Sequence, residues 1–474
     1  MAKPNLHVVL FPFPAHGHIS PHLNLAAHLH QYHSNLTVTL VSTPHNIAAI
    51  RSSLPPTSRL ELHSLPFCPA DHGLRTDSES TEDLPRDQFP IFFMAMESLC
   101  GAFDRFIAEA SKQSTICIIS DMFLGWTLDV AHKHNAFHSS LLGMSAFGGA
   151  VFLSLVMNLP HVDSESDPFT LPEYPEVVIH HSQLDVVILL ATKTDPPMLF
   201  VQKQLSTLYK TDALLINTTE YLDPVGIGML KKTLKLPVIP IGPLVGSSYS
   251  QILPSENESK IIDWLDIHPV ASVLYISFGS QNSIQKDQML ELALGLEASK
   301  RPFIWVIRPP LGFNAKVEFK DEWLPDGFEK RMKEQNRGFF VHRWAPQIAI
   351  LSHKATGAFL SHCGWNSVLE SLNSGVPIIG WPLEGDQPFN ATILVKLGLC
   401  VEVARGNMET SEVGKEKVAD AVEMVMGDNE KGRDMREKTK EISTMLKGAW
   451  KDESCSSPKG LAEFLKLIET VMDN

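Results

Sequence analysis

Short apolar runs alternate with longer helical patterns along almost the whole chain, and this rhythm restricts the fold more than any other feature. It is typical of a parallel sheet covered by helices on both faces. The predicted strands are Leu6–Phe11, Leu36–Val41, Arg59–Leu65, Ile116–Ser120, Phe137–Leu142, Ala213–Asn217, Val273–Phe278, Phe303–Ile307, Gly338–His342, Ala358–Leu360, Pro377–Trp381 and Cys400–Val403. With 474 residues the chain is too long for one ordinary core. We therefore expect an α/β protein with two Rossmann-like domains that face each other across a cleft.

The stretch from Ile239 to Ser259 is rich in Pro, Gly, Ser and Asn and lacks periodicity, which is typical of a linker. We place the first domain at 1–242, the linker at 243–258 and the second domain at 259–455. Polar patches at Thr76–Asp83 and Asp163–Glu176 are interpreted as surface loops.

Charge and cysteine usage exclude some classes of partner. The chain has 40 Lys and Arg against 54 Asp and Glu, a formal net charge of −14, which disfavours nucleic acid and anionic membranes. Its 6 cysteines are far apart and no secretory leader precedes the first strand, so we expect a reduced, cytoplasmic protein. The uncharged run from Ser139 to Pro160 is long enough to span a bilayer. Polar residues and glycines interrupt it, so we predict a buried strand and helix and no stable membrane insertion.

The segment WAPQIAILSHKATGAFLSHCGWNSVLESLNSGVPIIGWPLEGDQ, from Trp344 to Gln387, has the parts of a nucleotide-sugar site. A strand leads into a helix that opens at Trp365, and free backbone N–H groups at a helix start favour a phosphate. The other candidate contacts are Asn366 and Ser367 at the cap, Trp344 for a nucleobase, Glu370 for a ribose, and Asp386 and Gln387 for sugar hydroxyls. Taken alone, Trp344 and Trp365 could equally be core aromatics.

This segment resembles the 44-residue signature of plant family 1 glycosyltransferases, which transfer sugar from a uridine diphosphate (UDP) donor to small molecules. The resemblance covers nearly the whole chain and includes FPFPAHGHISP near the start, WLD at Trp264–Asp266 and YISFGS at Tyr275–Ser280. It implies the GT-B fold, in which a terminal helix, here within 456–474, packs back on the first domain. We also expect a monomer.

The resemblance assigns roles on the donor side residue by residue. It implies uracil stacking by Trp344 with Ala345 and Gln347 nearby, ribose binding by Glu370, diphosphate binding by Ser280, His362, Asn366 and Ser367, and sugar contacts by Trp365, Asp386 and Gln387. No DxD sequence or metal-ligand spacing occurs, so we expect no metal and no cofactor besides the donor substrate. Gln387 favours UDP-glucose, with galactose, xylose and glucuronic acid as the alternatives.

The acceptor hydroxyl needs a base, and His16 and His18 lie in the loop predicted after the first strand. The family places its base three residues before the proline that begins the first helix, here Pro21, which favours His18 over His16. The family's orienting aspartate ends a strand before a Phe-rich turn, which matches Asp121 in ICIISDMF. Alternatively, Asp121 caps a helix that begins near Phe123.

The predicted function is an inverting transfer of glucose from UDP-glucose to a hydroxyl of a flavonoid, phenolic or terpenoid acceptor, which gives a β-glucoside. The resemblance builds the acceptor pocket from Gln88–Cys100, Phe123, Met144–Phe147 and Val187–Phe200, which are rich in Phe, Met and Leu. Two alternatives stay open: another GT-B enzyme such as a nucleotide-sugar epimerase, and a non-catalytic binding protein for UDP-sugars or lipophiles. A nicotinamide oxidoreductase is disfavoured because PFPAHGH, not GxGxxG, follows the first strand.

Overall fold

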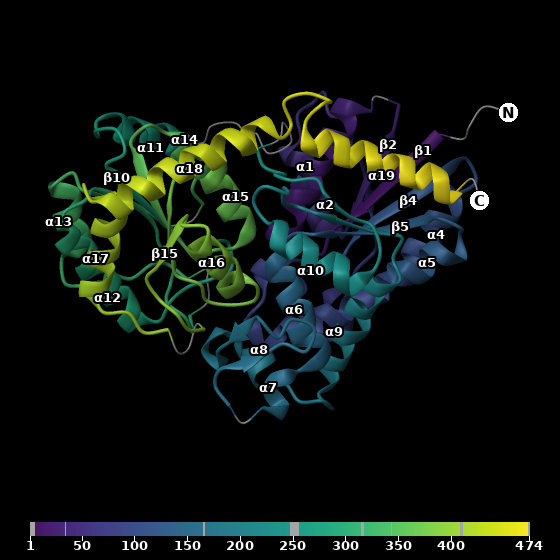
Figure 1. Ribbon diagram of the computed structural model, residues 1–474, viewed down its shortest axis with the longest axis horizontal. Helices are drawn as coiled ribbons and strands as arrows, with labels where there is room; N and C mark the ends of the chain where they lie inside the picture. The colour runs from purple at the N-terminus through teal and green to yellow at the C-terminus, as the bar shows by residue number, and fades with distance from the viewer. Residues whose placement is uncertain are drawn as a thin grey trace.

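The computed structural model describes residues 5–33, 35–164, 166–246, 256–313, 317–342, 344–407 and 411–472. Two parallel sheets, each flanked by helices, lie side by side (Figure 1). The first sheet has the strand order β3-β2-β1-β4-β5-β8-β9. Its strands are β1 (Asn5–Phe11), β2 (Thr37–Ser42), β3 (Glu61–Ser64), β4 (Ser114–Asp121), β5 (Phe137–Leu142), β8 (Ala213–Ile216) and β9 (Val238–Pro240).

The second sheet has the order β12-β11-β10-β13-β14-β15, and its neighbouring strands are also parallel. Its strands are β10 (Val273–Ser277), β11 (Phe303–Val306), β12 (Gly338–Val341), β13 (Thr356–Ser361), β14 (Ile378–Gly380) and β15 (Cys400–Glu402). A separate antiparallel pair joins β6 (Phe169–Thr170) to β7 (Val178–Ile179). Because all neighbours within each large sheet are parallel, the carboxyl ends of its strands share one edge, where ligand-binding loops gather.

Helices connect the strands and cover the sheets. In the first half they are α1 (His16–Tyr32), α2 (Pro44–Ser53), α3 (Phe89–Ala95), α4 (Cys100–Ala110), α5 (Thr127–Lys133), α6 (Ala146–Asn158), α7 (Pro160–Asp163), α8 (Val186–Leu189), α9 (Pro196–Ser206) and α10 (Pro224–Leu234). In the second half they are α11 (Glu256–Asp266), α12 (Lys286–Ser299), α13 (Phe328–Glu334), α14 (Gln347–Ser352), α15 (Trp365–Ser374), α16 (Gln387–Lys396), α17 (Lys415–Met426), α18 (Glu430–Gly448) and α19 (Ser456–Met472). α18 and α19 run along one side of the molecule, and α19 buries Leu461, Phe464 and Ile468 against the first sheet (Figure 1).

All twelve predicted strands are present, with ends that differ by at most two residues from those predicted. The interpretation of Ile239 as the start of the linker is wrong. β9 pairs with β8 at the edge of the first sheet and includes Ile239, which is 2% exposed. Three residues that end in a proline are too short a run for a strand pattern to be seen. The segment 247–255, which makes up most of the predicted linker, lies outside the described residues.

The start of α1 also differs from the prediction. The helix begins at His16, so His16 and His18 lie in its first turn and not in a preceding loop, and Pro21 lies inside the helix. A proline has no N–H to donate to the carbonyl four residues earlier, here that of Gly17. Asn366 Nδ2, from the second sheet's α15, donates to that carbonyl at 2.7 Å. The unusual proline is thus accommodated by a contact between the two halves.

The uncharged run from Ser139 to Pro160 forms the end of β5 and the whole of α6, which confirms the predicted buried strand and helix. Ten residues of α6 are buried, and it packs on α9, α10 and α16. Among the described residues, no helix is both long and apolar enough to cross a bilayer.

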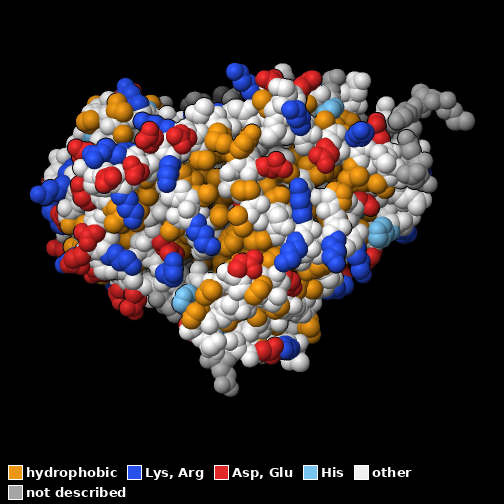
Figure 2. Space-filling view, in the orientation of Figure 1, with side chains coloured by type: hydrophobic (Ala, Val, Ile, Leu, Met, Phe, Trp, Pro, Cys, Tyr) orange, Lys and Arg blue, Asp and Glu red, His pale blue; other side chains and the backbone are white. Residues whose placement is uncertain are grey.

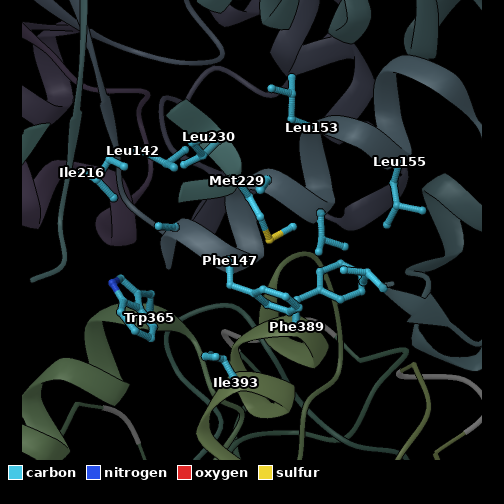
Figure 3. Packing of buried hydrophobic residues seen from close by; sticks show 14 of the residues in the cluster. Leu142, Phe147, Leu153, Leu155, Ile216, Met229, Leu230, Trp365, Phe389 and Ile393 are labelled. Atoms are coloured by element: carbon cyan, nitrogen blue, oxygen red, sulfur yellow. The ribbon is translucent and has the colours of Figure 1, made fainter. Parts of the chain in front are cut away.

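One apolar cluster belongs to both halves of the molecule. Phe147 of α6 and Met229 of α10 lie above Phe389 and Ile393 of α16, and Trp365 of α15 closes the cluster on one side (Figure 3). All five side chains are at most 7% exposed. Interfaces between domains move easily unless they are large and apolar. The cluster therefore joins the two sheets firmly along this side.

On the face seen in Figure 2, Lys and Arg side chains are mixed with Asp and Glu side chains and do not form a basic patch among the described residues. Apolar side chains gather near the middle of this face. The mixed charges agree with the net charge of −14 and give this face no feature that would attract a polyanion.

Candidate active site

A cleft of about 2820 Å³ runs between the carboxyl edges of the two sheets. Twelve of the thirteen predicted site residues line it: His18, Asp121, Ser280, Trp344, Ala345, Gln347, His362, Trp365, Asn366, Ser367, Glu370 and Asp386. The thirteenth, Gln387, does not line the cleft and is described below. Residues far apart in the sequence are thus brought to one place.

His18 and Asp121 form a direct pair on the side of the first sheet. His18 Nδ1 lies 2.6 Å from Asp121 Oδ2, and Asp121 ends β4 as predicted. The His18 side chain is 30% exposed while that of Asp121 is 3% exposed. Burial lowers the pKa of His18, but the charge and hydrogen bond of Asp121 outweigh it, so the pKa is raised above its ordinary value. Such a pair holds the ring with Nε2 free to accept a proton.

The second oxygen of Asp121 has a structural role. Phe123 N donates to Asp121 Oδ1 at 3.1 Å, so this oxygen caps a turn. The helix predicted to begin near Phe123 begins four residues later, at Thr127. Asp121 thus both pairs with His18 and caps the turn that follows its strand.

Aromatic side chains surround the His18 ring. The rings of Phe13 and Phe123 each lie with their centroids 5.8 Å from that of His18. Phe93 of α3 lies against both, at 4.4 Å from Phe13 and 4.9 Å from Phe123. Phe93 and Phe123 belong to the predicted acceptor region, whereas Phe13 was not predicted. Phe13 is only 1% exposed, whereas Phe93 and Phe123 are partly buried, so the base lies at the edge of an aromatic cluster.

The start of α15 lies on the opposite side of the cleft. Its N-cap, Gly364, provides no side-chain cap, so the amides of the first turn are left for a ligand. Asn366 Oδ1 is buried and has no hydrogen-bond partner within the described chain. His362 is enclosed by Gly279 and Gly364, where a Cβ atom would lie 2.6 Å and 2.5 Å from its Nε2. The free amides at this positive helix end suit a phosphate, whereas Asn366 Oδ1 is an acceptor that would need a donor from the ligand.

Gln347 organises the region predicted for the nucleoside. Its Nε2 donates to Glu370 Oε2 at 2.7 Å and to Ser367 Oγ at 2.9 Å, while Tyr275 donates to its Oε1 at 3.1 Å. Burial raises the pKa of Glu370 to about 7. Trp344 is 55% exposed, and its ring centroid lies 5.0 Å from that of His16 across the cleft, with the ring planes 77° apart. The exposed indole leaves a face for stacking, unlike that of a core tryptophan.

Three residues predicted to contact the sugar differ in what they offer. Asp386 lines the cleft, and its charge interacts with that of His18. Trp365 is 3% exposed and donates its indole N–H to Asn217 O at 2.6 Å, so it also joins the two halves. Gln387 is buried and its Oε1 accepts from Leu383 N at 3.0 Å and Glu384 N at 3.1 Å. Gln387 thus shapes the loop before α16, and only its Nε2 is left to reach a ligand.

The known proteins to which this chain is similar belong to one family. The family described as UDP-glucoronosyl and UDP-glucosyl transferase matches residues 260–444. UDP-glycosyltransferase 92A1 of Arabidopsis thaliana is 40% identical over 98% of this chain and 97% of its own. This chain belongs to the UDP-glycosyltransferase family. Crocetin glucosyltransferase 3 of Crocus sativus is 37% identical over 93% of this chain and 94% of its own.

The solved structure of Glycyrrhiza uralensis UGT73P12, complexed with glycyrrhetinic acid 3-O-monoglucuronide, superposes with a TM-score of 0.83. It is 28% identical and the match covers 98% of this chain and 96% of that one. The two parallel sheets across a cleft are those of the GT-B fold, as predicted. The chain is thus a UDP-glycosyltransferase in fold and family.

Glu82 of the transferase lies in Thr76–Asp83, which the sequence predicts as a surface loop, yet it joins the two halves. Its Oε1 accepts from His16 N at 2.8 Å and from Ser280 Oγ at 3.4 Å. Arg86, three residues after this segment, pairs with Glu384 and donates to Asn282 Oδ1 at 2.7 Å. Both side chains therefore bridge the two halves across the cleft.

Arg308 of the transferase was not predicted as a site residue. It follows β11, lines the cleft and donates to the backbone carbonyl of Ser280. The family resemblance assigns Ser280 but not Arg308, although both are polar residues shortly after a strand of the second sheet. Among the described residues no group of three or more His, Cys, Asp or Glu is placed to hold a metal ion.

Proposed function

We propose that this UDP-glycosyltransferase moves glucose from UDP-glucose to a hydroxyl of a lipophilic small molecule, with inversion, to give a β-glucoside. The observation that carries the proposal is the His18–Asp121 pair, which lines the cleft opposite the start of α15. A base on one side and an anion site on the other are what a single displacement at a sugar carbon needs.

In this mechanism His18 Nε2 takes the proton of the acceptor hydroxyl as its oxygen attacks the anomeric carbon. Asp121 holds the ring through Nδ1 and stabilises the imidazolium that forms. The bond from the anomeric carbon to UDP breaks on the opposite side, and the negative charge of the leaving diphosphate is stabilised by the first turn of α15.

The donor half supports UDP as the carrier. Trp344 offers an exposed face for uracil, and Glu370, held by Gln347, is an acceptor for ribose hydroxyls. Asp386 supports a contact with sugar hydroxyls from within the cleft. The relative from Crocus sativus is named a glucosyltransferase, which favours glucose as the sugar.

The acceptor half supports a lipophilic partner. Phe123 lies beside the base and Phe93 against Phe123; both are partly buried, whereas Phe13 is 1% exposed and packs against the two. Burying a lipophile against the accessible parts of Phe93 and Phe123 is favourable at roughly 25 cal/mol per Å². An acceptor with one hydroxyl near His18 and an apolar body against these rings fits the arrangement.

The decisive experiment is a UDP-release assay with several UDP-sugars and a panel of phenolic, flavonoid and terpenoid acceptors, in which products are identified by mass and anomeric coupling. We expect a β-glucoside and little UDP release without acceptor. His18→Ala should lower turnover by about 10² or more and leave UDP affinity nearly unchanged. An α-linked product, or wild-type turnover in this variant, would refute the mechanism.

The same assay separates the two alternatives. A nucleotide-sugar epimerase would convert or hydrolyse the donor without an acceptor. A binding protein would bind the UDP-sugar without cleaving it, so no UDP would be released. Either result would refute the proposed glucosyl transfer in favour of that alternative.

A further inference from the structure

A chain of hydrogen bonds crosses from the first half of the molecule to Asp386. Ser145, the N-cap of α6, donates through Oγ to Asn390 Oδ1 at 2.6 Å. Asn390 Nδ2 donates to Asp386 Oδ2 at 2.6 Å and to Cys363 O at 3.0 Å. Ser145 and Asn390 are both fully buried, whereas Asp386 lines the cleft. Buried side chains with such complete pairing hold one geometry.

The direction of each hydrogen bond in this chain is determined. Ser145 Oγ accepts from Gly148 N at 2.8 Å, so its own proton is available for Asn390 Oδ1. If the Asn390 amide were reversed, its oxygen would face the Asp386 carboxylate and the Cys363 carbonyl. Two acceptors in contact repel each other, so only the observed orientation satisfies all partners.

The first turn of α6 leaves space for the Asn390 side chain of α16. A Cβ atom at Gly148 would lie 2.8 Å from Asn390 Oδ1 and 2.7 Å from Ser145 Oγ. Any side chain at this position would therefore push Asn390 away. The absence of a side chain at 148 and the hydroxyl at 145 together admit the Asn390 amide.

We propose that Ser145 and Asn390 are positioning residues that fix the Asp386 carboxylate for the donor sugar, so that the acceptor half completes the sugar site. The proposal rests on the proposed function, in which Asp386 binds sugar hydroxyls. Because Asn390 holds Oδ2, the plane of the carboxylate is set before the donor arrives. The Asp386 carboxylate then has the position needed to bind the sugar only when α6 packs against α16.

The test compares the affinities for UDP-glucose and UDP by calorimetry without acceptor, for wild type and two variants. Asn390→Asp keeps the side-chain shape but places two carboxylates in contact. At high pH both are ionised and repel, so UDP-glucose affinity should fall about tenfold while UDP affinity stays within about twofold. As the pH falls the pair shares one proton, which replaces the amide hydrogen, and the defect should shrink.

Ser145→Ala removes the hydroxyl and should weaken UDP-glucose binding in the same direction, about threefold to tenfold, without the pH dependence. It also removes a helix cap. The matched control is Asn429→Ala, which removes the N-cap of α18, whose Oδ1 accepts from Gly432 N at 2.8 Å. Asn429→Ala should lower the melting temperature as Ser145→Ala does and leave both affinities unchanged.

Kinetics add a second readout, in which KM for UDP-glucose rises in both variants while KM for the acceptor stays the same. Equal losses of UDP and UDP-glucose affinity, or a pH-independent defect in Asn390→Asp, would overturn the positioning role and leave Ser145 and Asn390 a role in folding. If the wild type binds UDP-glucose and both variants bind it equally well, only the positioning role is refuted. If the wild type binds no UDP-sugar, both the positioning role and the proposed function are refuted.

Discussion

Asp121→Asn should remove most of the catalytic activity, because of where the two oxygens of Asp121 point. Oδ1 accepts from Phe123 N at 3.1 Å and Oδ2 pairs with His18 Nδ1 at 2.6 Å. The asparagine of this variant keeps its carbonyl oxygen on the Phe123 amide, so its NH2 group faces His18. His18 Nδ1 must then accept, and the ring proton moves to Nε2. The nitrogen that should take the acceptor's proton is already protonated.

The magnitude follows from the burial of the pair, since the Asp121 side chain is only 3% exposed. Removing one partner of a buried ion pair costs about 3–5 kcal/mol. If this loss falls on the transition state, where His18 becomes charged, turnover drops by about 10²- to 10⁴-fold. UDP affinity should stay nearly unchanged, since its predicted contacts come from the second half.

The pH profile gives a second measure. A base must be neutral, and Asp121 raises the pKa of His18, so wild-type turnover should rise with pH along a limb above 6.5. Without the carboxylate, burial is the largest influence on the pKa of His18 and lowers it, opposed by the smaller effects of the Asp386 and Glu82 charges. The limb of the Asp121→Asn variant should therefore move to lower pH, with a lower plateau.

Initial rates from about pH 5 to pH 9 test both expectations. Asp104→Asn is a matched control, since Asp104 Oδ1 lies 2.8 Å from His134 Nε2 in a pair that does not line the cleft. It makes the same chemical change and should keep wild-type turnover. An Asp121→Asn variant with unchanged turnover and an unmoved limb would mean that Asp121 serves only as the cap of the Phe123 turn.

Three further results are expected. Activity should persist after exhaustive chelation, because helix dipole and side chains stabilise the diphosphate; activity that Mg²⁺ or Mn²⁺ restores would contradict this. UDP affinity should decrease as the pH falls below about 7, where Glu370 becomes protonated and can no longer accept from both ribose hydroxyls. The Glu370→Gln variant should bind UDP more weakly, and its UDP affinity should not change over this pH range. If calorimetry finds that the UDP affinity of the wild type does not depend on pH, the role of Glu370 in ribose binding is refuted. Gln387→Ala should lower glucose transfer by roughly 10- to 100-fold, because Leu383 and Glu384 lose their acceptor. A variant that keeps the wild-type preference among equimolar UDP-sugars would exclude any part of Gln387 in donor choice.

The twelve strands could be predicted from sequence because each is a compact apolar run between helical patterns. β9 and the pair β6–β7 could not, since two or three residues carry no periodicity. The start of α1 was misplaced because a proline normally marks a helix start. The long-range contact of Asn366 with Gly17 O, which satisfies the carbonyl that Pro21 leaves without a donor, could not be seen in the sequence.

Many residues of the candidate site, among them Asp121 and Ser280, are assigned by the family resemblance, and the fold explains why they meet. Parallel strands end at a common edge, so residues at or shortly after their ends gather in the cleft. Contacts across the cleft could not be predicted from the sequence, because nothing local marks Glu82 or Arg86 as a residue that bridges the two halves. The orientation of a side chain was equally hidden, as the loop contacts of Gln387 Oε1 show.

The apolar cluster shared by the two halves limits how sequences of this kind can be recombined. A chimera that takes its first half from one relative and its second from another must match Phe147 to Phe389 and keep the Trp365 indole on Asn217 O. A mismatch there leaves a cavity or an unpaired buried N–H, each costing about 1–3 kcal/mol. Exchange of acceptor preference by transplanting a whole half therefore has to carry α15 and α16 with it, or redesign α6 and α10 to fit.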